Sequence, residues 1–306
     1  MQKYRFSRYF PLTINSLQAI TMTIQAAFAY IIHTISPLYD NREAANIAHI
    51  VMEHITGMSR LDRVVYKDRP LEAPQQQQLE TALQALLRKE PVQYVTGSSW
   101  FYGLEFTVSP DVLIPRPETE ELVSWIVEEL QTAGRETAHV LDIGTGSGCI
   151  PIAIKKECPS ATVWAIDVSV GALEIAALNA SKLQQAVHFE KVNILEETAV
   201  ENLPLFDVIV SNPPYIRQEE QADMQQQVWG FEPALALFVP DQDPLLFYRH
   251  IGALAQHKLQ AGGTLYFEIN EAYGQEVITL LTAQGFREPT LRKDIFGKDR
   301  MVKAFR

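Results

Sequence analysis

An apolar segment that runs directly into a glycine-rich turn constrains the fold of this chain more than any other feature. Residues 138–143 predict a buried strand, and Gly144-Thr145-Gly146-Ser147-Gly148 follows at once. Glycines allow the backbone to turn tightly and to approach a ligand closely, and the helix expected next offers free N–H groups. A strand, a glycine turn and a helix in this order predict a ligand site at the carboxyl edge of an α/β sheet.

Strands alternate with helices over the whole C-terminal part of the chain, which predicts a doubly wound, mostly parallel sheet. The last two strands predict an antiparallel terminal hairpin. We expect strands at 138–143, 161–167, 186–191, 206–211, 263–269, 286–292 and 300–305, and helices at 148–157, 169–182, 242–258 and 271–284.

Residues 1–90 predict a small helical bundle, which is either a stabilising appendage or a docking module for a macromolecular substrate. The apolar run at 17–32 is interrupted by polar residues, so it predicts an amphipathic helix rather than a signal peptide or a membrane span. Apolar residues at helical spacing place helices at 15–33, 40–56, 60–66 and 74–89.

Residues 91–117 form a linker of different character. The aromatic-rich runs 91–97 and 100–108 predict a β-hairpin, and a helix is expected to begin at Pro117 or Thr119 and to reach about residue 130. The Ile114–Pro117 turn has two prolines around an arginine, so its backbone is stiff. It either closes over a ligand or serves as a hinge, and the sequence leaves both open.

Charge and cysteine content restrict the classes of partner and site. The 306 residues carry a formal net charge of -11, which disfavours a protein that grips a nucleic acid through its whole surface. Only two cysteines are present, Cys149 and Cys158, and neither has a metal-ligand companion nearby in the sequence. We therefore expect no metal site, no disulfide scaffold and a reducing cytoplasm.

The tetrapeptide Asn212-Pro213-Pro214-Tyr215 follows the expected strand at 206–211. Consecutive prolines fix two φ angles and remove two N–H donors, and a residue before a proline is held extended. The Asn212 side-chain oxygen and nearby carbonyls then form a cluster of acceptors that suits both hydrogens of a planar –NH2 group. Asn-Pro-Pro is also a common way to start a loop, so the tetrapeptide alone does not distinguish a binding site from an ordinary loop.

Two further strand ends carry candidate ligand contacts. Asp167 closes the second strand, where a carboxylate can accept both hydroxyls of a ribose. It could instead cap the next helix, but Ser169 is better placed for that role. After the third strand, Asn193 and Ile194 are candidates to meet an adenine amine and to cover its ring, although Asn193 is equally suited to a turn.

These motifs occur in the order found in class I S-adenosylmethionine methyltransferases, and the tetrapeptide resembles the signature of enzymes that methylate amino groups of adenine, cytosine or glutamine. Nearly the whole chain resembles the peptide chain release factor glutamine methyltransferases. The segments that carry this resemblance are Pro91–Gly97, Phe101–Gly103, Leu113–Glu120, Ser211–Ile216, Phe231–Leu237, Asp243–Tyr248 and Phe267–Ile269.

The resemblance implies an α/β, Rossmann-like seven-stranded methyltransferase domain at 118–306, a hairpin linker at 91–117 and a helical domain at 1–90. It implies methylation, from S-adenosyl-L-methionine, of the glutamine in the Gly-Gly-Gln motif of class I release factors. It implies catalytic roles for Asn212, Pro213 and Tyr215, and substrate contacts from these three and Pro214. The cofactor contacts that it implies are Gly144, Thr145, Gly146, Ser147, Gly148, Asp167, Asn193, Ile194 and Asn212.

Two departures from the family pattern stand out. Residues Met1–Leu12 extend beyond the usual start, as a tail or a variant start site, and Asn193-Ile194 replaces the more common Asp followed by an aromatic residue. We expect a cytoplasmic monomer that acts on release factors and binds neither nucleic acid directly nor a membrane. An adenine-N6 nucleic-acid methyltransferase, a nicotinamide enzyme and a cofactor-binding docking protein without turnover are the alternatives.

Overall fold

The computed structural model describes residues 22–135, 137–196, 202–223 and 226–306. The chain divides into two compact units, Met1–Arg88 and Lys89–Arg306. The N-terminal extension Met1–Leu12 and the first part of the helix expected at 15–33 lie outside the described residues.

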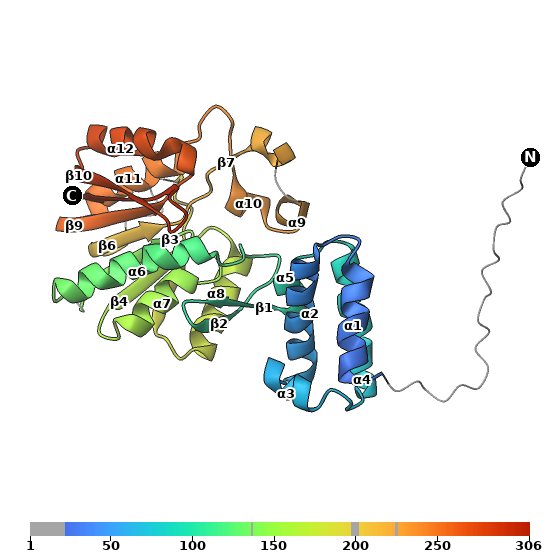
Figure 1. The fold of residues 1–306 in the computed structure, drawn as a ribbon. Coiled ribbons are helices and arrows are strands. Elements are labelled where there is room, and N and C mark those ends of the chain that lie inside the picture. Colours follow the sequence, from blue (N-terminus) through green and yellow to red (C-terminus); the bar gives the residue numbers. More distant parts are fainter. Residues whose placement is uncertain (1–21, 136, 197–201, 224–225) are drawn as a thin grey trace, which may run out of the picture. The chain divides into compact units, whose positions relative to one another are not determined.

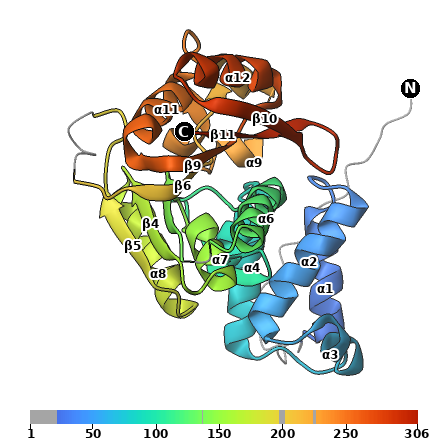
Figure 2. The ribbon, with the colours of Figure 1, turned by 90° about the vertical axis from the view of Figure 1, so that its left-hand side faces the viewer.

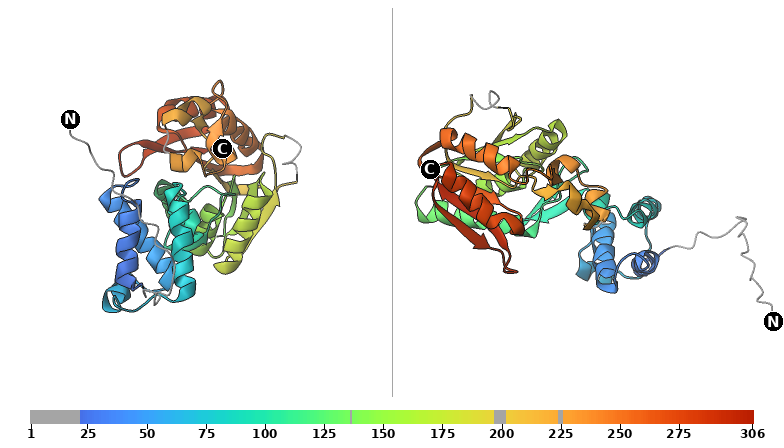
Figure 3. Two further views of the ribbon diagram at one scale, coloured as in Figure 1. Left: turned by 90° about the vertical axis from the view of Figure 1, so that its right-hand side faces the viewer. Right: turned by 90° about the horizontal axis from the view of Figure 1, so that it is seen from above.

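The first unit is helical, as the sequence predicts. The Asp40 carboxylate caps its second helix by accepting from the N–H groups of Arg42 and Glu43, and Gly57 ends that helix with a φ of 64°. Three of the helices lie side by side and bury their apolar faces together, which is visible in Figure 1 and in the left view of Figure 3. The helices of this unit are α1 (Ile24–Ile35), α2 (Asn41–Thr56), α3 (Arg60–Val65) and α4 (Ala73–Leu87).

The second unit is built on a mixed sheet of seven strands, in the order β10-β11-β9-β6-β3-β4-β5. Five neighbouring strands, from β9 to β5, are parallel, and β11 is antiparallel to both β9 and β10. The predicted strands and the terminal hairpin are therefore confirmed. The strands are β3 (His139–Ile143), β4 (Thr162–Asp167), β5 (Val187–Lys191), β6 (Phe206–Ser211), β9 (Leu259–Glu268), β10 (Arg287–Lys293) and β11 (Asp299–Phe305).

Helices cover both faces of this sheet (Figure 2). One apolar core joins α6, α7 and α8 to one face, and another joins α11 and α12 to the opposite face. The strand order changes direction between the parallel strands β3 and β6: β4 and β5 follow outward on one side of this pair, and β9 follows on the other. Ligands of open α/β sheets bind at such a switch point. The helices of these layers are α6 (Pro117–Thr132), α7 (Cys149–Glu157), α8 (Val170–Lys182), α11 (Leu246–Lys258) and α12 (Gly274–Ala283).

The linker corrects one expectation. The run 91–97, expected as a strand, is a one-turn helix, α5 (Val92–Thr96), which ends at Gly97 with a φ of 68°. The hairpin follows it as β1 (Ser98–Phe101) and β2 (Leu104–Thr107). Tyr94 decides the local structure, because its buried side chain donates a hydrogen bond to the Val112 carbonyl at 2.7 Å. This tertiary contact outweighs the strand preference of the β-branched and aromatic residues around it.

Short elements complete the second unit between β6 and α11. They are β7 (Ile216–Arg217), the 3-10 turn Gln218–Asp223, α9 (Gln226–Trp229), α10 (Ala234–Leu237) and β8 (Phe238–Val239). Another 3-10 turn, Glu271–Tyr273, precedes α12. Across the described residues, no helix combines the length and the apolar character needed to cross a bilayer.

Candidate active site

The glycine turn lies at the carboxyl end of β3 and leads into α7. Gly144, Gly146 and Gly148 all have positive φ angles, of 74°, 53° and 78°. At Gly148 a Cβ atom would also stand 3.1 Å from the Ala176 Cβ, so the turn needs glycine there for close packing against α8. Gly144 and Gly146 line a cavity, whereas the side chains of Thr145 and Ser147 are buried in the turn.

Four buried oxygen atoms around this turn meet no hydrogen-bond donor or acceptor at ordinary distances within the described residues. They are both carboxylate oxygens of Asp142 and the hydroxyl oxygens of Thr145 and Ser147. Burial raises the pKa of the Asp142 carboxyl to about 7, and the nearby Thr145 side chain offsets this only in part. Unpartnered buried polar groups are costly in a folded protein, and a bound water molecule or ligand at this turn would offset that cost.

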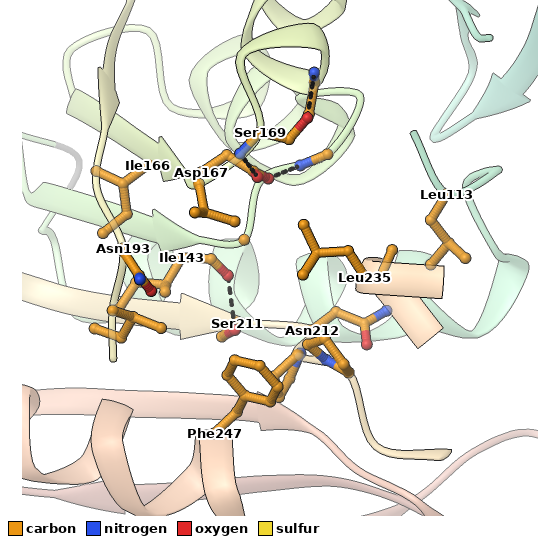
Figure 4. Close-up of a pocket in the computed structure, with 18 of the residues that line it drawn as sticks. Leu113, Ile143, Ile166, Asp167, Ser169, Asn193, Ser211, Asn212, Leu235 and Phe247 are labelled. Atoms are coloured by element: carbon orange, nitrogen blue, oxygen red, sulfur yellow. Dashed lines mark hydrogen bonds between the residues drawn. The ribbon is translucent and has the colours of Figure 1, made fainter. Parts of the chain in front are cut away.

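Asp167 lies at the carboxyl end of β4 and lines the same cavity. One carboxylate oxygen accepts from the Gly146 N–H and the other from the Ser169 N–H, each at 2.9 Å. Each oxygen keeps a lone pair for a further donor, such as a sugar hydroxyl. The Ser169 hydroxyl accepts from the Ala172 N–H and caps α8, which confirms the predicted cap and leaves Asp167 directed at the cavity (Figure 4).

Asn193 and Ile194 follow β5 and also line the cavity. The Asn193 side chain is engaged locally: its oxygen accepts from the Leu195 N–H at 3.1 Å, and its nitrogen donates to Glu196 at 2.9 Å. The residue therefore forms the turn that the sequence left as an alternative, while it also forms part of the cavity wall.

The tetrapeptide begins where β6 ends, beside the glycine turn. The Ser211 hydroxyl donates to the Ile143 carbonyl at 2.7 Å and so ties the ends of β6 and β3 together. Asn212, Pro213 and Pro214 line the cavity, which Figure 4 shows with Asn212 opposite Leu235. The cavity has a volume of about 270 Å³ and combines polar groups from four strand ends with apolar walls.

The side chains of Asn212 and Tyr215 are held by two residues that the sequence did not single out for the site. The Asn212 amide nitrogen donates to the Thr119 hydroxyl at 3.2 Å, and this hydroxyl donates to Glu268 at 2.6 Å. The Tyr215 hydroxyl donates to the other oxygen of Glu268 at 3.2 Å. A glutamate at the carboxyl end of an apolar strand is the signal that could have found Glu268, whereas the sequence marks Thr119 only as a possible start of a helix.

Tyr215 lies outside the set of residues that line the cavity. Its side chain is partly exposed and packs beside the core between the sheet and α11. Burial of the hydroxyl and the neighbouring Glu268 raise the pKa of Tyr215 far above its ordinary value. The phenol therefore stays protonated and acts as a hydrogen-bond donor.

The linker forms one wall of the cavity through Asp111, Val112 and Leu113. Glu232 holds it there: its carboxylate pairs with Arg116 at 2.6 Å and accepts from the Ile114 N–H at 3.4 Å. Both of these partners of Glu232 lie in the linker. No cluster of His, Cys, Asp and Glu within the described ranges is arranged to hold a metal ion.

Comparison with known proteins agrees with this geometry. Residues 122–230 match the Methyltransferase small domain family, and residues 31–97 match the PrmC N-terminal domain family. The release factor glutamine methyltransferase of Flavobacterium psychrophilum is 44% identical over 89% of this chain and 95% of its own length. That of Bacteroides thetaiotaomicron is 44% identical over 91% of this chain and 98% of its own.

The chain belongs to the release factor glutamine methyltransferase family. The resemblance drawn from the linker, the tetrapeptide and the segment around Glu232 is thereby confirmed. The matches cover nearly all of each relative, so they extend beyond the sheet domain into the linker and the helical unit.

Solved structures confirm the fold of the sheet domain. The catalytic domain of human Mettl16 superposes with a TM-score of 0.53 and 16% identity over 76% of this chain and 82% of that one. The Thermus thermophilus RsmC methyltransferase does so with a TM-score of 0.50 and 19% identity over 68% of this chain and 49% of its own. The predicted Rossmann-like methyltransferase fold is therefore present in this family member.

Proposed function

We propose that this protein transfers a methyl group from S-adenosyl-L-methionine to the side-chain amide nitrogen (N5) of the glutamine in the Gly-Gly-Gln motif of class I peptide chain release factors. The observation that carries the proposal is the position of the Asn212 amide, which lines the same cavity as the glycine turn and Asp167. Identity of 44% to curated release factor glutamine methyltransferases supports the choice of acceptor.

The residues present fit S-adenosyl-L-methionine. The Asp167 carboxylate keeps acceptor capacity for ribose hydroxyls, and Gly144 and Gly146 let the ligand approach the backbone. Asn193 and Ile194 both line the cavity, which supports assigning them to the adenine ring, with Ile194 as its apolar contact. The side chains of Asp142, Thr145 and Ser147 are buried within the turn and are not among the residues that line the cavity, so we assign Thr145 and Ser147 to the cofactor site through their backbone. We also assign Gly148 to this site, because it fixes the turn.

The acceptor amide is a poor nucleophile, because its nitrogen lone pair is delocalised into the carbonyl. The cofactor supplies an electrophilic methyl group on a positively charged sulfur. Asn212 Oδ1 and the Pro213 carbonyl accept the two hydrogens of the glutamine –NH2 and thereby orient its lone pair. Positioning of this kind lowers a barrier by several kcal/mol. Pro214 stiffens the loop, and Tyr215 packs beside the planar amide.

As the nitrogen bonds to the methyl carbon, the bond from that carbon to sulfur breaks and leaves S-adenosyl-L-homocysteine as the product. The proton leaves the glutamine nitrogen late and passes to solvent water, because that nitrogen becomes acidic only as the new bond forms. Asn212 and Pro213 are acceptors of hydrogen bonds rather than strong bases, and the site needs no group of high proton affinity. Glu268 is buried behind Thr119 and Tyr215, where it orients other groups. Catalysis therefore depends on the arrangement of neutral acceptors.

The substrate is a protein. The net charge of -11 opposes approach to a polyanion and agrees with a release factor as partner rather than duplex DNA. We infer that the enzyme acts as a cytoplasmic monomer and that its helical unit contacts the release factor.

The test uses labelled S-adenosyl-L-methionine with three acceptors: a class I release factor, its Gln→Ala variant in the Gly-Gly-Gln motif, and nucleic acid. We expect label in the intact release factor alone, and a mass increase of one methyl group on the Gly-Gly-Gln peptide. Equal labelling of the Gln→Ala variant would refute the assignment. Label in nucleic acid but not in protein would support an adenine-N6 methyltransferase, and tight cofactor binding without transfer would support a docking protein.

A further inference from the structure

Three side chains form a continuous hydrogen-bonded chain behind the Asn212 amide. They come from separate elements: Thr119 from the first turn of α6, Glu268 from the end of β9 and Tyr215 from the loop after β6. Thr119 is 3% exposed and Glu268 is 1% exposed, so water does not compete for their hydrogen bonds. The chain runs from Asn212 through Thr119 to Glu268, which also receives the Tyr215 hydroxyl.

The direction of each hydrogen bond follows from the chemistry of Glu268. The Thr119 hydroxyl donates its single hydrogen to Glu268, as it must when that carboxylate is ionised and can only accept. The Thr119 oxygen is then left as an acceptor, and it takes a hydrogen from the Asn212 amide nitrogen. With that nitrogen engaged, the Asn212 oxygen is left to accept from a further donor, and Asn212 lines the cavity.

A flipped Asn212 amide would be penalised. Its oxygen would face the Thr119 oxygen, whose hydrogen is already engaged, so two acceptors would meet and a buried hydrogen bond would be lost. The –NH2 group would then face the cavity, where it cannot accept a hydrogen from an incoming carboxamide. An amide without this support has no comparable preference, because its oxygen and nitrogen are similar in size and shape.

We propose that Glu268 and Thr119 are positioning residues that fix the polarity of the Asn212 carboxamide, so that its oxygen is presented to the acceptor amide. The inference rests on the proposed function in one respect, the role of Asn212 as an acceptor for the substrate –NH2. Glu268 acts through Thr119 and does not touch the reacting atoms.

The surroundings of Glu268 decide how firmly this polarity holds. Burial raises its pKa, while the hydrogen bond from Thr119, the positive charge of Arg300 and the hydrogen bond from Tyr215 oppose that rise. Glu118 raises it further. A protonated Glu268 could donate to Thr119 and release the hydroxyl hydrogen toward Asn212, which would remove the preference.

The test compares Thr119→Val, which removes the hydroxyl at nearly constant volume, with Thr119→Ser, which keeps it. A hydrogen bond in a network with a charged group contributes roughly 1.5–3 kcal/mol, so we expect Thr119→Val to lower kcat by about 10- to 100-fold. Thr119→Ser should retain most of the kcat, and cofactor Kd should be unchanged in both.

Glu268→Gln, whose amide can donate as well as accept, should lower kcat in the same way. Thr264→Val, a buried threonine on the same strand, is the matched control and should leave kcat unchanged.

A second measurement does not depend on turnover. Hydrogen exchange of the Asn212 side-chain –NH2, assigned by its loss in Asn212→Ala, should show one protected proton in the wild type and in Thr119→Ser but not in Thr119→Val. Protection together with an enzyme that fails to methylate any release factor would remove the proposed function and keep the inference. Wild-type kcat in Thr119→Val, equal losses in Thr119→Val and Thr119→Ser, or unprotected Asn212 protons in the wild type would overturn the inference.

Discussion

Arg116 donates to Glu232 at 2.6 Å, and the glutamate side chain is 2% exposed. This ion pair joins the linker to the segment that follows α9, and both segments supply walls of the cavity. Burial raises the pKa of Glu232, whereas the charge of Arg116 and its hydrogen bond oppose that rise. The pair therefore holds the linker where residues 111–113 form part of the cavity wall.

Removal of Arg116 alone should lower the free energy of unfolding more than removal of both Arg116 and Glu232. Arg116→Met leaves a buried carboxylate without its cation, which typically costs about 3–5 kcal/mol in the free energy of unfolding. Arg116→Met with Glu232→Leu should recover much of this loss. Urea denaturation of the wild type, the two single variants and the double variant measures these changes in the free energy of unfolding. Calorimetry should show weaker cofactor binding in Arg116→Met. Lys182→Met breaks an exposed pair with Glu105 and should change stability by less than about 1 kcal/mol. Equal losses in the single and double variants would contradict the prediction.

Asn212 and Asp167 should separate turnover from cofactor binding. Asn212→Ala removes an acceptor for the substrate amide, so we expect kcat to fall by about 10²- to 10³-fold, the loss seen when one oriented polar group is removed from an active site. Its cofactor Kd should stay nearly unchanged. Asp167→Ala removes the carboxylate that faces the cavity and should weaken cofactor binding first. Isothermal titration and single-turnover kinetics check both. Loss of cofactor affinity in Asn212→Ala would show that its role has been misassigned.

The sequence predicts the seven-stranded sheet well because each strand is a short apolar run bounded by turn residues, and local pattern is enough to define it. The glycine turn and the ends of β4 and β6 were also found, since the carboxyl ends of parallel strands meet at one edge. The α5 turn was missed, because a contact of Tyr94 with the Val112 carbonyl overrides local preference there. Strand β9 begins earlier than expected, at Leu259, because it continues through Gly262 and Gly263, which by themselves predict a turn.

The hydrogen-bonded chain behind Asn212 was not predictable for a different reason. Thr119 and Glu268 are 149 positions apart, and their contact exists only because α6 and β9 are adjacent in the fold. A threonine in the first turn of a helix is common, and a single glutamate at the end of a strand forms no repeating pattern, so neither residue indicates its partner. Pairings of this kind require the tertiary structure.

Asn179 should be a structural anchor of the hairpin. Its side chain is fully buried in α8, accepts from the Thr107 N–H at 2.7 Å and donates to the carbonyls of Thr107 and Ser147, both at 2.9 Å. Asn179→Ala leaves these three backbone groups unpaired, so the free energy of unfolding should fall by about 3 kcal/mol or more, at roughly 1–3 kcal/mol for each unsatisfied group. Glu174→Ala, on the exposed side of the same helix, should change it by no more than about 0.5 kcal/mol. Urea denaturation compares the two, and similar small effects would argue against the anchor.

Asp142 should make the protein without cofactor less stable as the pH rises. Burial raises its pKa from 3.8 to about 7, so the folded state binds more protons than the unfolded state between these values. Stability therefore falls as pH rises from about 4 to about 7, and about three pKa units at 1.36 kcal/mol each correspond to at most about 4 kcal/mol. Asp142→Asn cannot titrate, so its free energy of unfolding should depend less steeply on pH in this range. Glu128→Gln, at an exposed position on α6, should keep the wild-type slope. Parallel pH profiles for the wild type and Asp142→Asn would mean that this buried carboxyl titrates at its ordinary value, and they would contradict the prediction.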